Sequence, residues 1–147
     1  MRIIVQRCDK AEVRVEGKIV GKINYGMMLL VSFTYGDTEK EIDYLVNKVL
    51  NLRIFDDENG VMNKSILDIN GEILSISQFT LYANTSKGNR PSYIDALKGE
   101  DAIKLYDMFN EKLKSKIHTE TGVFGAEMKV DFINDGPITI LLEKENK

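Results

Sequence analysis

A nearly continuous apolar run follows Gly26 and constrains the fold more than any other feature of the chain. It comprises residues 27–31, with Phe33 two positions further on. The run has the length of a strand and is far too short to span a bilayer as a helix. A strand that lacks polar alternation is covered on both faces, so we expect this run to form an inner strand of a sheet.

Other parts of the chain alternate between apolar and polar residues, as half-buried strands do. Residues 3–7 show this alternation, and residues 13–20 predict a hairpin that turns at residues 16–18. Further strands are predicted at residues 73–81, 126–133 and 138–142. Residues 134–137, with the sequence Asn-Asp-Gly-Pro, predict a turn between the last two strands.

Two segments carry apolar residues at helical spacing. The first begins at Thr38 and Glu41, which have the three-residue spacing of a capping box. Its apolar stripe is Ile42, Leu45, Val46, Val49 and Leu52. The second spans residues 102–117, and its stripe is Ile103, Tyr106, Phe109 and Leu113. A short helix is also expected over residues 93–97.

These patterns predict an α+β fold with a mainly antiparallel, barrel-like sheet and about two long helices. The sequence contains no linker or repeat, and 147 residues is a usual domain size, so we expect a single domain over residues 1–147. Hydrophobic residues make up 43% of the chain and charged residues 29%, which excludes intrinsic disorder and low-complexity classes.

Charge and the reactive side chains narrow the function. Lys and Arg number 20 against 23 Asp and Glu, a net charge of -3. This balance excludes a protein that coats nucleic acid or anionic membrane by bulk charge, but it allows a small site for an RNA end. A single Cys and a single His exclude a disulfide framework and a Cys/His zinc cluster within one chain. The N-terminal residues lack the features of a secretory signal, so we expect a cytoplasmic protein. We also expect that it needs neither a metal nor a cofactor.

No standard catalytic set is apparent. His118 lies in a charged helix end, where a solvated or dipole-favoured imidazole is the preferred interpretation. Cys8 has no base near it in sequence, so a small buried side chain is preferred over a reactive thiol. The acidic residues 56–60 lack the spaced ligands of a calcium loop and predict a solvated turn. No glycine-rich phosphate-binding motif or HExxH motif occurs.

Two polar segments remain unexplained by packing alone. The first brings Ser77, Gln78 and Thr80 around Phe79 at a strand end, where backbone N–H groups are free to bind a ligand oxygen. On spacing alone, a solvent-facing strand edge is still the favoured interpretation. The second is residues 134–139, for which an ordinary turn is the alternative to a cis Gly-Pro bond that presents two carbonyl groups to a ligand.

Taken together, the motifs resemble the D-aminoacyl-tRNA deacylase family of the bacterial and eukaryotic type. MRIIVQR resembles the opening of that family, RIFDDENGVMNKS its central turn and SQFTLYANTSKGNRPSYIDA its most characteristic stretch. GVFGAEMKV and NDGPITILL resemble its closing segments. The resemblance covers essentially the whole chain, and no motif position departs from the family pattern.

The resemblance implies hydrolysis of the ester bond of D-aminoacyl-tRNA, and of glycine mischarged on alanine tRNA. It implies a homodimer with two active sites at the subunit interface and the aminoacyl-tRNA acceptor end as substrate. Each pocket would be formed by Ser77, Gln78, Phe79 and Thr80 of one subunit. The cis Gly136-Pro137 motif of the other subunit would enter it, held in orientation by Arg7.

An aminoacyl ester is already activated, so positioning and oxyanion stabilisation can suffice, with one donor worth roughly 3 kcal/mol. Backbone N–H groups near Phe79 and Thr80 are the candidate donors, and the ribose 2′-hydroxyl is a candidate activator of water. We prefer a positioning role for Thr80 to covalent attack. Phe79 is expected to stack on the terminal adenine.

Carbonyl groups of Gly136 and Pro137 would collide with an L side chain, so L-aminoacyl esters are rejected while glycine passes. Replacing Gly136 with Ala is expected to crowd the pocket with little effect on folding. Two alternatives stay open, a non-catalytic RNA-binding module and a small esterase that uses Thr80 or a serine. Lys87, Arg90 and Lys98 are candidates for phosphate contacts, although a solvated loop is favoured for each.

Overall fold

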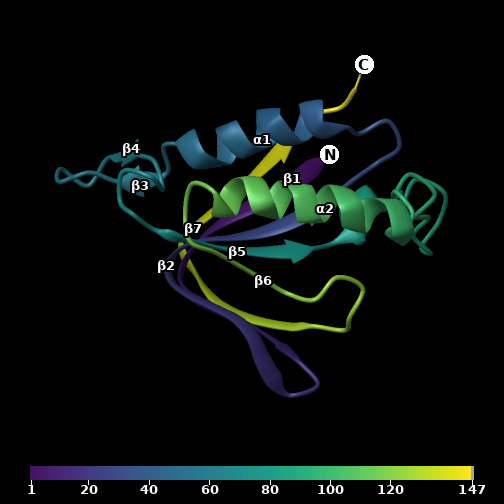
Figure 1. Ribbon diagram of the computed structural model, residues 1–147, viewed down its shortest axis with the longest axis horizontal. Helices are drawn as coiled ribbons and strands as arrows, with labels where there is room; N and C mark the ends of the chain where they lie inside the picture. Colours follow the sequence, from purple (N-terminus) through teal and green to yellow (C-terminus); the bar gives the residue numbers. More distant parts are fainter. Residues whose placement is uncertain (147) are drawn as a thin grey trace.

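The apolar run after Gly26 lies within strand β2 (Lys18–Ser32) in a computed structural model, which describes residues 1–146. β2 is the central strand of a five-stranded sheet with the order β6-β5-β2-β1-β7 (Figure 1). Met27, Leu29 and Val31 belong to one core cluster, whereas Met28 belongs to a second cluster. Because neighbouring residues of a strand point to opposite faces, the expectation of a strand covered on both faces is confirmed.

The other elements are β1 (Arg2–Val15), α1 (Glu39–Asn51), β3 (Phe55–Asp56), β4 (Met62–Lys64), β5 (Glu72–Ser77), the 3₁₀ helix η1 (Phe79–Tyr82), α2 (Gly99–Lys114), β6 (Thr119–Thr121) and β7 (Lys129–Glu143). β3 and β4 form a separate two-stranded sheet around the acidic turn. The predicted α+β class with two long helices is confirmed, while the single domain over residues 1–147 stays a prediction. Within residues 1–146, no helix has the length and apolar character needed to cross a membrane.

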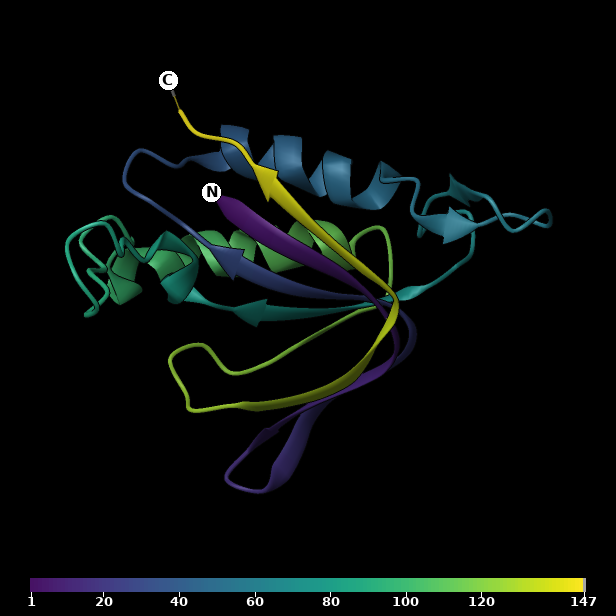
Figure 2. The ribbon, with the colours of Figure 1, turned by 180° about the vertical axis from the view of Figure 1, so that it is seen from behind.

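The longest strand pairings of the sheet are antiparallel, as expected. β1 pairs antiparallel with both β2 and β7. β5 runs parallel to β2, and the short β6 runs parallel to β5, so the sheet is mixed. β6 and β7 are its two edges, and the sheet curves without closing into a barrel (Figure 2).

Both long helices cover one face of the sheet (Figures 1 and 2). The capping box that Thr38 and Glu41 predict is present at the start of α1. The Thr38 N–H donates to the Glu41 carboxylate at 2.7 Å, and the Lys40 N–H donates to the Thr38 hydroxyl at 3.3 Å. In α2, Ala102 is buried and Ile103 is not, so the predicted stripe is displaced at its first position.

A pronounced bend divides the sheet into two halves, each with its own core. The register of β1 with β7 is interrupted between Gln6 and Cys8 and again between Cys8 and Ala11, and such bulges bend a strand. The helices cover one core, and the β1–β2 hairpin curls with β7 around the other (Figure 1). Gly26 lies at this bend, where a Cβ would come within 1.8 Å of the Glu72 carbonyl oxygen, so glycine allows β2 and β5 to meet.

Three sequence expectations are wrong, and the short strands β3, β4 and β6 were not anticipated. Residues 93–97 form turns and a bridge between Ala96 and Thr34 instead of a helix. The strand expected through Leu81 ends at Ser77. Residues 134–137 lie inside the continuous strand β7 instead of forming a turn, because β1 pairs with both sides of them. β6 has only three residues, two of them threonine, too few for a recognisable pattern.

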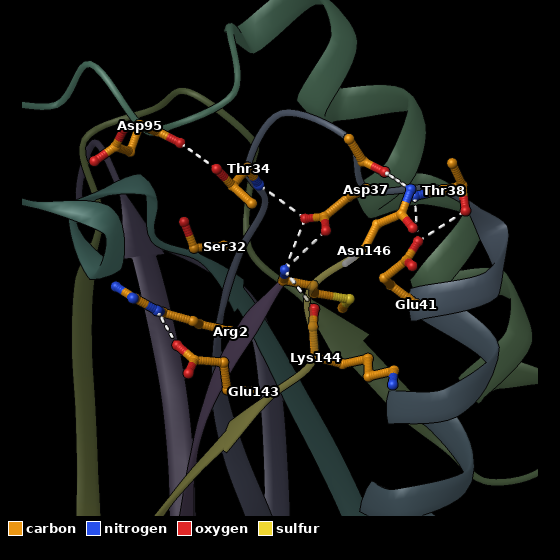
Figure 3. Close-up of polar contacts among 12 residues, drawn as sticks. Arg2, Ser32, Thr34, Asp37, Thr38, Glu41, Asp95, Glu143, Lys144 and Asn146 are labelled. Carbon is orange, nitrogen blue, oxygen red and sulfur yellow. Dashed lines mark hydrogen bonds and ion pairs between the residues drawn. The ribbon is translucent and has the colours of Figure 1, made fainter.

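A buried polar network holds the chain beyond the end of β2 (Figure 3). The Met1 ammonium group donates to the Asp37 carboxylate at 2.9 Å and to the Lys144 carbonyl at 3.0 Å. The same carboxylate accepts the Thr34 N–H at 2.8 Å, and the Thr34 hydroxyl donates to the Asp95 carbonyl at 2.6 Å. The network therefore joins Met1 and Lys144, near the two ends of the chain, to the segment that follows the loop of residues 83–92.

Candidate active site

The first polar segment begins where β5 ends, beside the end of β2. The Gln78 N–H donates to the Val31 carbonyl at 2.7 Å, after which the backbone of Gln78 turns out of the sheet. The Leu81 N–H donates to the Gln78 carbonyl at 3.2 Å, the first turn of η1. The N–H groups of Phe79 and Thr80 belong to the first turn of η1, where the helix has no carbonyl acceptor for them. They are therefore available to a ligand oxygen.

The side chains of this segment are ordered by neutral hydrogen bonds. The Gln78 amide donates to the Thr80 hydroxyl at 2.5 Å, and the Ser32 hydroxyl donates to the Phe79 carbonyl at 3.4 Å. Among residues 1–146, no carboxylate or imidazole forms a hydrogen bond with Thr80. The arrangement orients the Thr80 hydroxyl without providing a base to deprotonate it.

A cavity of about 530 Å³ opens beside Ser77, Gln78 and Phe79. It is lined mainly by apolar groups, and Phe79, 56% exposed, packs edge-on against Tyr93 with the ring centres 5.0 Å apart. Other lining residues are Phe33, Ala96, Leu97, Phe124, Gly125, Ala126 and Met128. An apolar, aromatic hollow beside free backbone donors suits a flat ring attached to a polar group.

Several of these lining residues were missed from sequence. Phe124, Ala126 and Met128 come from the GVFGAEMKV stretch, which carried part of the family resemblance but no residue-level role. That resemblance was the one signal available for them. Tyr93 was missed because residues 93–97 were expected to form a helix.

A buried polar pair supports β5 from behind. The Tyr106 hydroxyl of α2 donates to the Ser75 carbonyl at 2.7 Å, and the Tyr106 ring lies 5.7 Å from that of Phe124. Burial, opposed by hydrogen bonds to Ser75 and Asn110, raises the pKa of Tyr106. The phenol therefore stays protonated and donates, which fixes α2 against the strand that ends at Ser77.

The second polar segment forms a bulge in β7 opposite Arg7. Gln6 pairs with Thr139 and Cys8 pairs with Asn134, so the residues from Asp135 to Ile138 face Arg7 alone. The Gly136–Pro137 peptide bond is cis, as the resemblance implied. Gly136 has a φ of 120°, and a Cβ there would lie 2.7 Å from Ile138 Cγ1. The bulge therefore requires glycine at this position.

Arg7 connects this bulge to the rest of the fold. Its side chain is almost fully buried, and its guanidinium donates to the carbonyls of Asp135 at 3.3 Å and Ile54 at 2.8 Å. It also forms ion pairs with the carboxylates of Asp135 at 3.1 Å and Asp56 at 3.6 Å. The contacts hold the residue before Gly136 from both its main chain and its side chain.

Tyr25 adds a further contact to the same carboxylate. Its hydroxyl donates to Asp135 at 3.0 Å. Burial and this hydrogen bond raise the pKa of Tyr25 to about 12, so the phenol stays neutral. Asp135 therefore has one cationic and one neutral donor, which fixes the start of the bulge.

The two segments do not meet within one chain. Gly136 lies across from Arg7, which pairs with Met27, and Met27 pairs with Ile73, four residues before Ser77. Four residues along a strand amount to about 13 Å, and three strand spacings to about 14 Å, so the two segments are about 20 Å apart. A small ligand therefore cannot touch both segments of the same chain.

The other sequence candidates belong to neither segment, although Cys8 pairs with Asn134 at the start of the second one. Cys8 is buried, which raises the pKa of its thiol to about 12 and disfavours a thiolate. His118 precedes β6, and its imidazole lies 3.3 Å from the Glu120 carboxylate and 3.7 Å from the Glu72 carboxylate. Its carbonyl accepts a hydrogen bond from the Ile73 N–H, at the end of β5 opposite to Ser77. Lys87, Arg90 and Lys98 are all exposed. The side chains of residues 1–146 include no cluster of three or more His, Cys, Asp or Glu suited to a metal.

Comparisons with known proteins show which family the chain belongs to. A family model described as D-Tyr-tRNA(Tyr) deacylase matches residues 4–143. A relative from Bacillus cereus (strain B4264) named D-aminoacyl-tRNA deacylase is 53% identical over 99% of this chain and all of its own length. A Bacillus thuringiensis (strain Al Hakam) relative of the same name is 52% identical over the same shares.

Two solved structures share the fold. One, named c-Myc DNA Unwinding Element Binding Protein, has a TM-score of 0.94 and 41% identity, covering 99% of this chain and all of that one. Another, described as a probable eukaryotic D-amino acid tRNA deacylase, has a TM-score of 0.83 and 18% identity, covering 96% and 97%. On the family model and the full-length identity, this chain belongs to the D-Tyr-tRNA(Tyr) deacylase family.

Proposed function

We propose that this protein hydrolyses the ester bond between a D-amino acid and the 3′ end of tRNA, releasing free amino acid and tRNA. Family membership over residues 4–143 supports this activity. The observation that carries it is that Phe79 lines an apolar, aromatic cavity, while the N–H groups of Phe79 and Thr80 donate to no main-chain acceptor among residues 1–146. An aminoacyl ester on adenosine offers both a carbonyl oxygen for the donors and a flat base for the cavity.

The terminal adenine would occupy the cavity between Phe79, Tyr93 and Phe124. Stacking an unpaired base on an aromatic side chain is worth about 1–3 kcal/mol and tolerates different substrates. With the adenosine held there, the ester carbonyl would lie near the first N–H groups of η1. Each donor aimed at the developing oxyanion contributes roughly 3 kcal/mol to the barrier reduction.

Water, and not a protein nucleophile, would attack the ester. Thr80 is hydrogen-bonded to Gln78 and has no base beside it, while Cys8 and His118 lie elsewhere. The ribose 2′-hydroxyl of the substrate is next to the ester and can orient the water. This role for the substrate explains why no catalytic set is apparent, since an activated ester needs less help than an amide.

A homodimer would complete each active site. The Gly136-Pro137 bulge is about 20 Å from Ser77 within one chain, so a second chain must supply it. β7 is an edge strand, and it carries Ile133 and Leu141 with more than half of their surface exposed. Exposed apolar residues on an edge strand favour burial against a second copy.

Chirality would be enforced by rejection. The main-chain atoms of Gly136 and Pro137, held by the contacts of Arg7 with Asp135, would lie beside the substrate α-carbon. A rigid backbone there collides with an L side chain and leaves a D side chain free. Glycine has no side chain, so glycyl-tRNA(Ala) would also be cleaved, and the identity of a D side chain would matter little.

The two alternative functions have less support. A nucleic-acid-binding module without catalysis is disfavoured by the net charge of -3 and by the apolar character of the cavity. A small esterase with Thr80 as nucleophile is disfavoured because the residue lacks a base. A substrate used in translation also favours a cytoplasmic location.

Purified protein incubated with D-tyrosyl-tRNA and, separately, with L-tyrosyl-tRNA tests the proposal. We expect rapid release of D-tyrosine, no release of L-tyrosine above the spontaneous rate, and cleavage of glycyl-tRNA(Ala). Equal rates on the D and L esters would contradict the steric filter. If none of the three aminoacyl-tRNAs is cleaved, the proposed enzymatic activity is contradicted.

A further inference from the structure

A second cleft, of about 640 Å³, lies next to the first cavity and differs from it in character. Its lining is mostly polar and includes Arg2, Thr34, Tyr82, Asn84, Asp95 and Asn146. Figure 3 shows Arg2, Thr34, Asp95 and Asn146 around the end of β2. We refer to it as the Tyr82 cleft.

The Tyr82 cleft and the first cavity are lined by different residues of the same segments. Phe79, at the start of η1, lines the cavity, and Tyr82, at its end, lines the cleft. These two residues are separated by one turn of a 3₁₀ helix, about 6 Å. The segment after the loop of residues 83–92 is shared too, with Tyr93 in the cavity and Asp95 in the cleft. An RNA strand that leaves the cavity over η1 enters the cleft within one nucleotide.

The cleft contains an unsatisfied buried polar group. Tyr82 is only 4% exposed, and its hydroxyl has no hydrogen-bond partner among residues 1–146. Burial raises the pKa of Tyr82 well above its ordinary value, so the hydroxyl is a neutral donor. The Arg2 guanidinium lies 4.3 Å from the centre of the Tyr82 ring and holds it in place. Because an unpaired buried hydroxyl is costly, a water that bridges this hydroxyl to a ligand in the cleft would be bound favourably.

The charged groups that line the cleft determine which part of a nucleotide can bind there. Arg2 is already engaged by the Glu143 carboxylate and by the Leu81 carbonyl at 2.8 Å. Asp95 and Glu145 add two carboxylates to the lining. These carboxylates would repel a phosphate. Ribose hydroxyls and the amino group of a base can instead donate to carboxylate and amide acceptors, as the cytosine amino group does to Asp or Glu.

We infer that the Tyr82 cleft binds the nucleoside that immediately precedes the terminal adenosine of tRNA, through its base and ribose and not through its phosphate. In the common CCA end of tRNA this nucleoside is cytidine. The inference rests on the proposed function and extends it, because it gives the enzyme a means to distinguish the end of a tRNA from other aminoacyl esters.

Three short substrates separate the parts of the nucleotide. They are the D-tyrosyl esters of adenosine, of 5′-phosphoadenosine and of the dinucleotide CpA. We expect the CpA ester to have a KM about three- to tenfold below that of the phosphoadenosine ester, the usual effect of one or two neutral hydrogen bonds. Adding the phosphate alone should bring no gain, and kcat should be similar for all three.

Two variants locate the effect in the cleft. Tyr82→Phe removes only the hydroxyl, and Asp95→Asn removes a carboxylate while keeping the main-chain carbonyl that accepts from Thr34. Each should abolish most of the CpA advantage and leave cleavage of the adenosine ester unchanged. Tyr44→Phe, which removes an exposed hydroxyl on α1, is the matched control and should behave as wild type. Thermal unfolding of each variant verifies that it is folded.

Equal KM values for the CpA and phosphoadenosine esters would overturn the inference, as would a gain from the phosphate alone. Variants that slow the adenosine and CpA esters by the same factor would also overturn it, since they would show a structural effect. If wild type cleaves D-tyrosyl-tRNA but gains nothing from the cytidine, only this inference fails. If it cleaves none of the esters, including D-tyrosyl-tRNA, the proposed function fails with it.

Discussion

The Thr80 hydroxyl accepts a hydrogen bond from Gln78, and among residues 1–146 no base is hydrogen-bonded to it. This arrangement favours a positioning role for Thr80 over covalent attack. We expect Thr80→Ala and Thr80→Ser to retain D-aminoacyl-tRNA cleavage within about tenfold of wild type, the cost of one hydrogen bond. Rapid-quench mass spectrometry of the Thr80→Ser variant provides the check. An acyl-enzyme adduct on that serine, together with an inactive Thr80→Ala, would show that Thr80 is a nucleophile.

Gly136 has a backbone conformation that other residues adopt only under strain. With φ at 120° and Ile138 Cγ1 2.7 Å from the position of a Cβ, Gly136→Ala should lower the free energy of unfolding by about 1–3 kcal/mol. The sequence alone indicated a crowded pocket with little effect on folding, because it could not reveal the bulge. Urea unfolding measures the change, with Gly88→Ala, an exposed loop glycine with positive φ and no contact near its Cβ, as control. A Gly136→Ala loss no larger than that of the control would contradict the contribution of Ile138.

The candidate site residues were predicted from sequence motifs and not from geometry. Ser77, Gln78, Phe79 and Thr80 were selected as a polar strand end, and Arg7 only through the family resemblance. The contacts of Arg7 with Asp135 and Ile54 depend on strand register and a bulge, which no local pattern encodes. Tyr82 was not selected, because a tyrosine beside a polar loop gives no sign that its hydroxyl is buried without a partner.

At the scale of single elements, α1 depends on a capping box whose acid is buried. Burial opposes ionisation of Glu41, but the hydrogen bonds from the Thr38 hydroxyl and N–H outweigh it and lower the pKa of Glu41. A lowered pKa in the folded state adds stability above the unfolded value, about 4.3, and loses it as pH falls through the folded value.

Glu41→Gln should therefore reduce the free energy of unfolding at pH 7 by about 1 kcal/mol. The difference from wild type should shrink as the pH falls below 4, because wild type then loses the same ionised acceptor. Urea unfolding of both proteins between pH 7 and pH 3 measures it. A difference that stays constant over this range would show that ionisation of Glu41 contributes nothing to the cap.

Elements with strong local signals were predicted, and those set by distant partners were not. The hairpin of residues 13–20 and the start of α1 follow from turn and capping residues. Residues 93–97 were wrongly predicted as a helix because their main chain is bound by Phe33 and Thr34. β7 was divided at residues 134–137 because those residue types favour a turn, whereas pairing with β1 on both sides keeps the strand continuous.

At the scale of the whole molecule, the sheet keeps the two site segments apart. β1 and β2 lie between the bulge of β7 and the end of β5, so folding of one chain cannot bring Gly136 to Phe79. The α+β class followed from the sequence, but this separation did not, since it depends on the order and register of the strands. It is the main structural reason for proposing that two chains share each active site.

Mixing two inactive chains tests this shared site directly. One chain carries Gln78→Ala and Phe79→Ala, and the other carries Gly136→Ala, each verified as folded by circular dichroism. If the chains exchange freely, half of the dimers are mixed and each has one intact site, so D-tyrosyl-tRNA cleavage should return to about a quarter of the wild-type rate. A mixture no more active than its separate components, or a fully active wild-type monomer by sedimentation, would contradict the account.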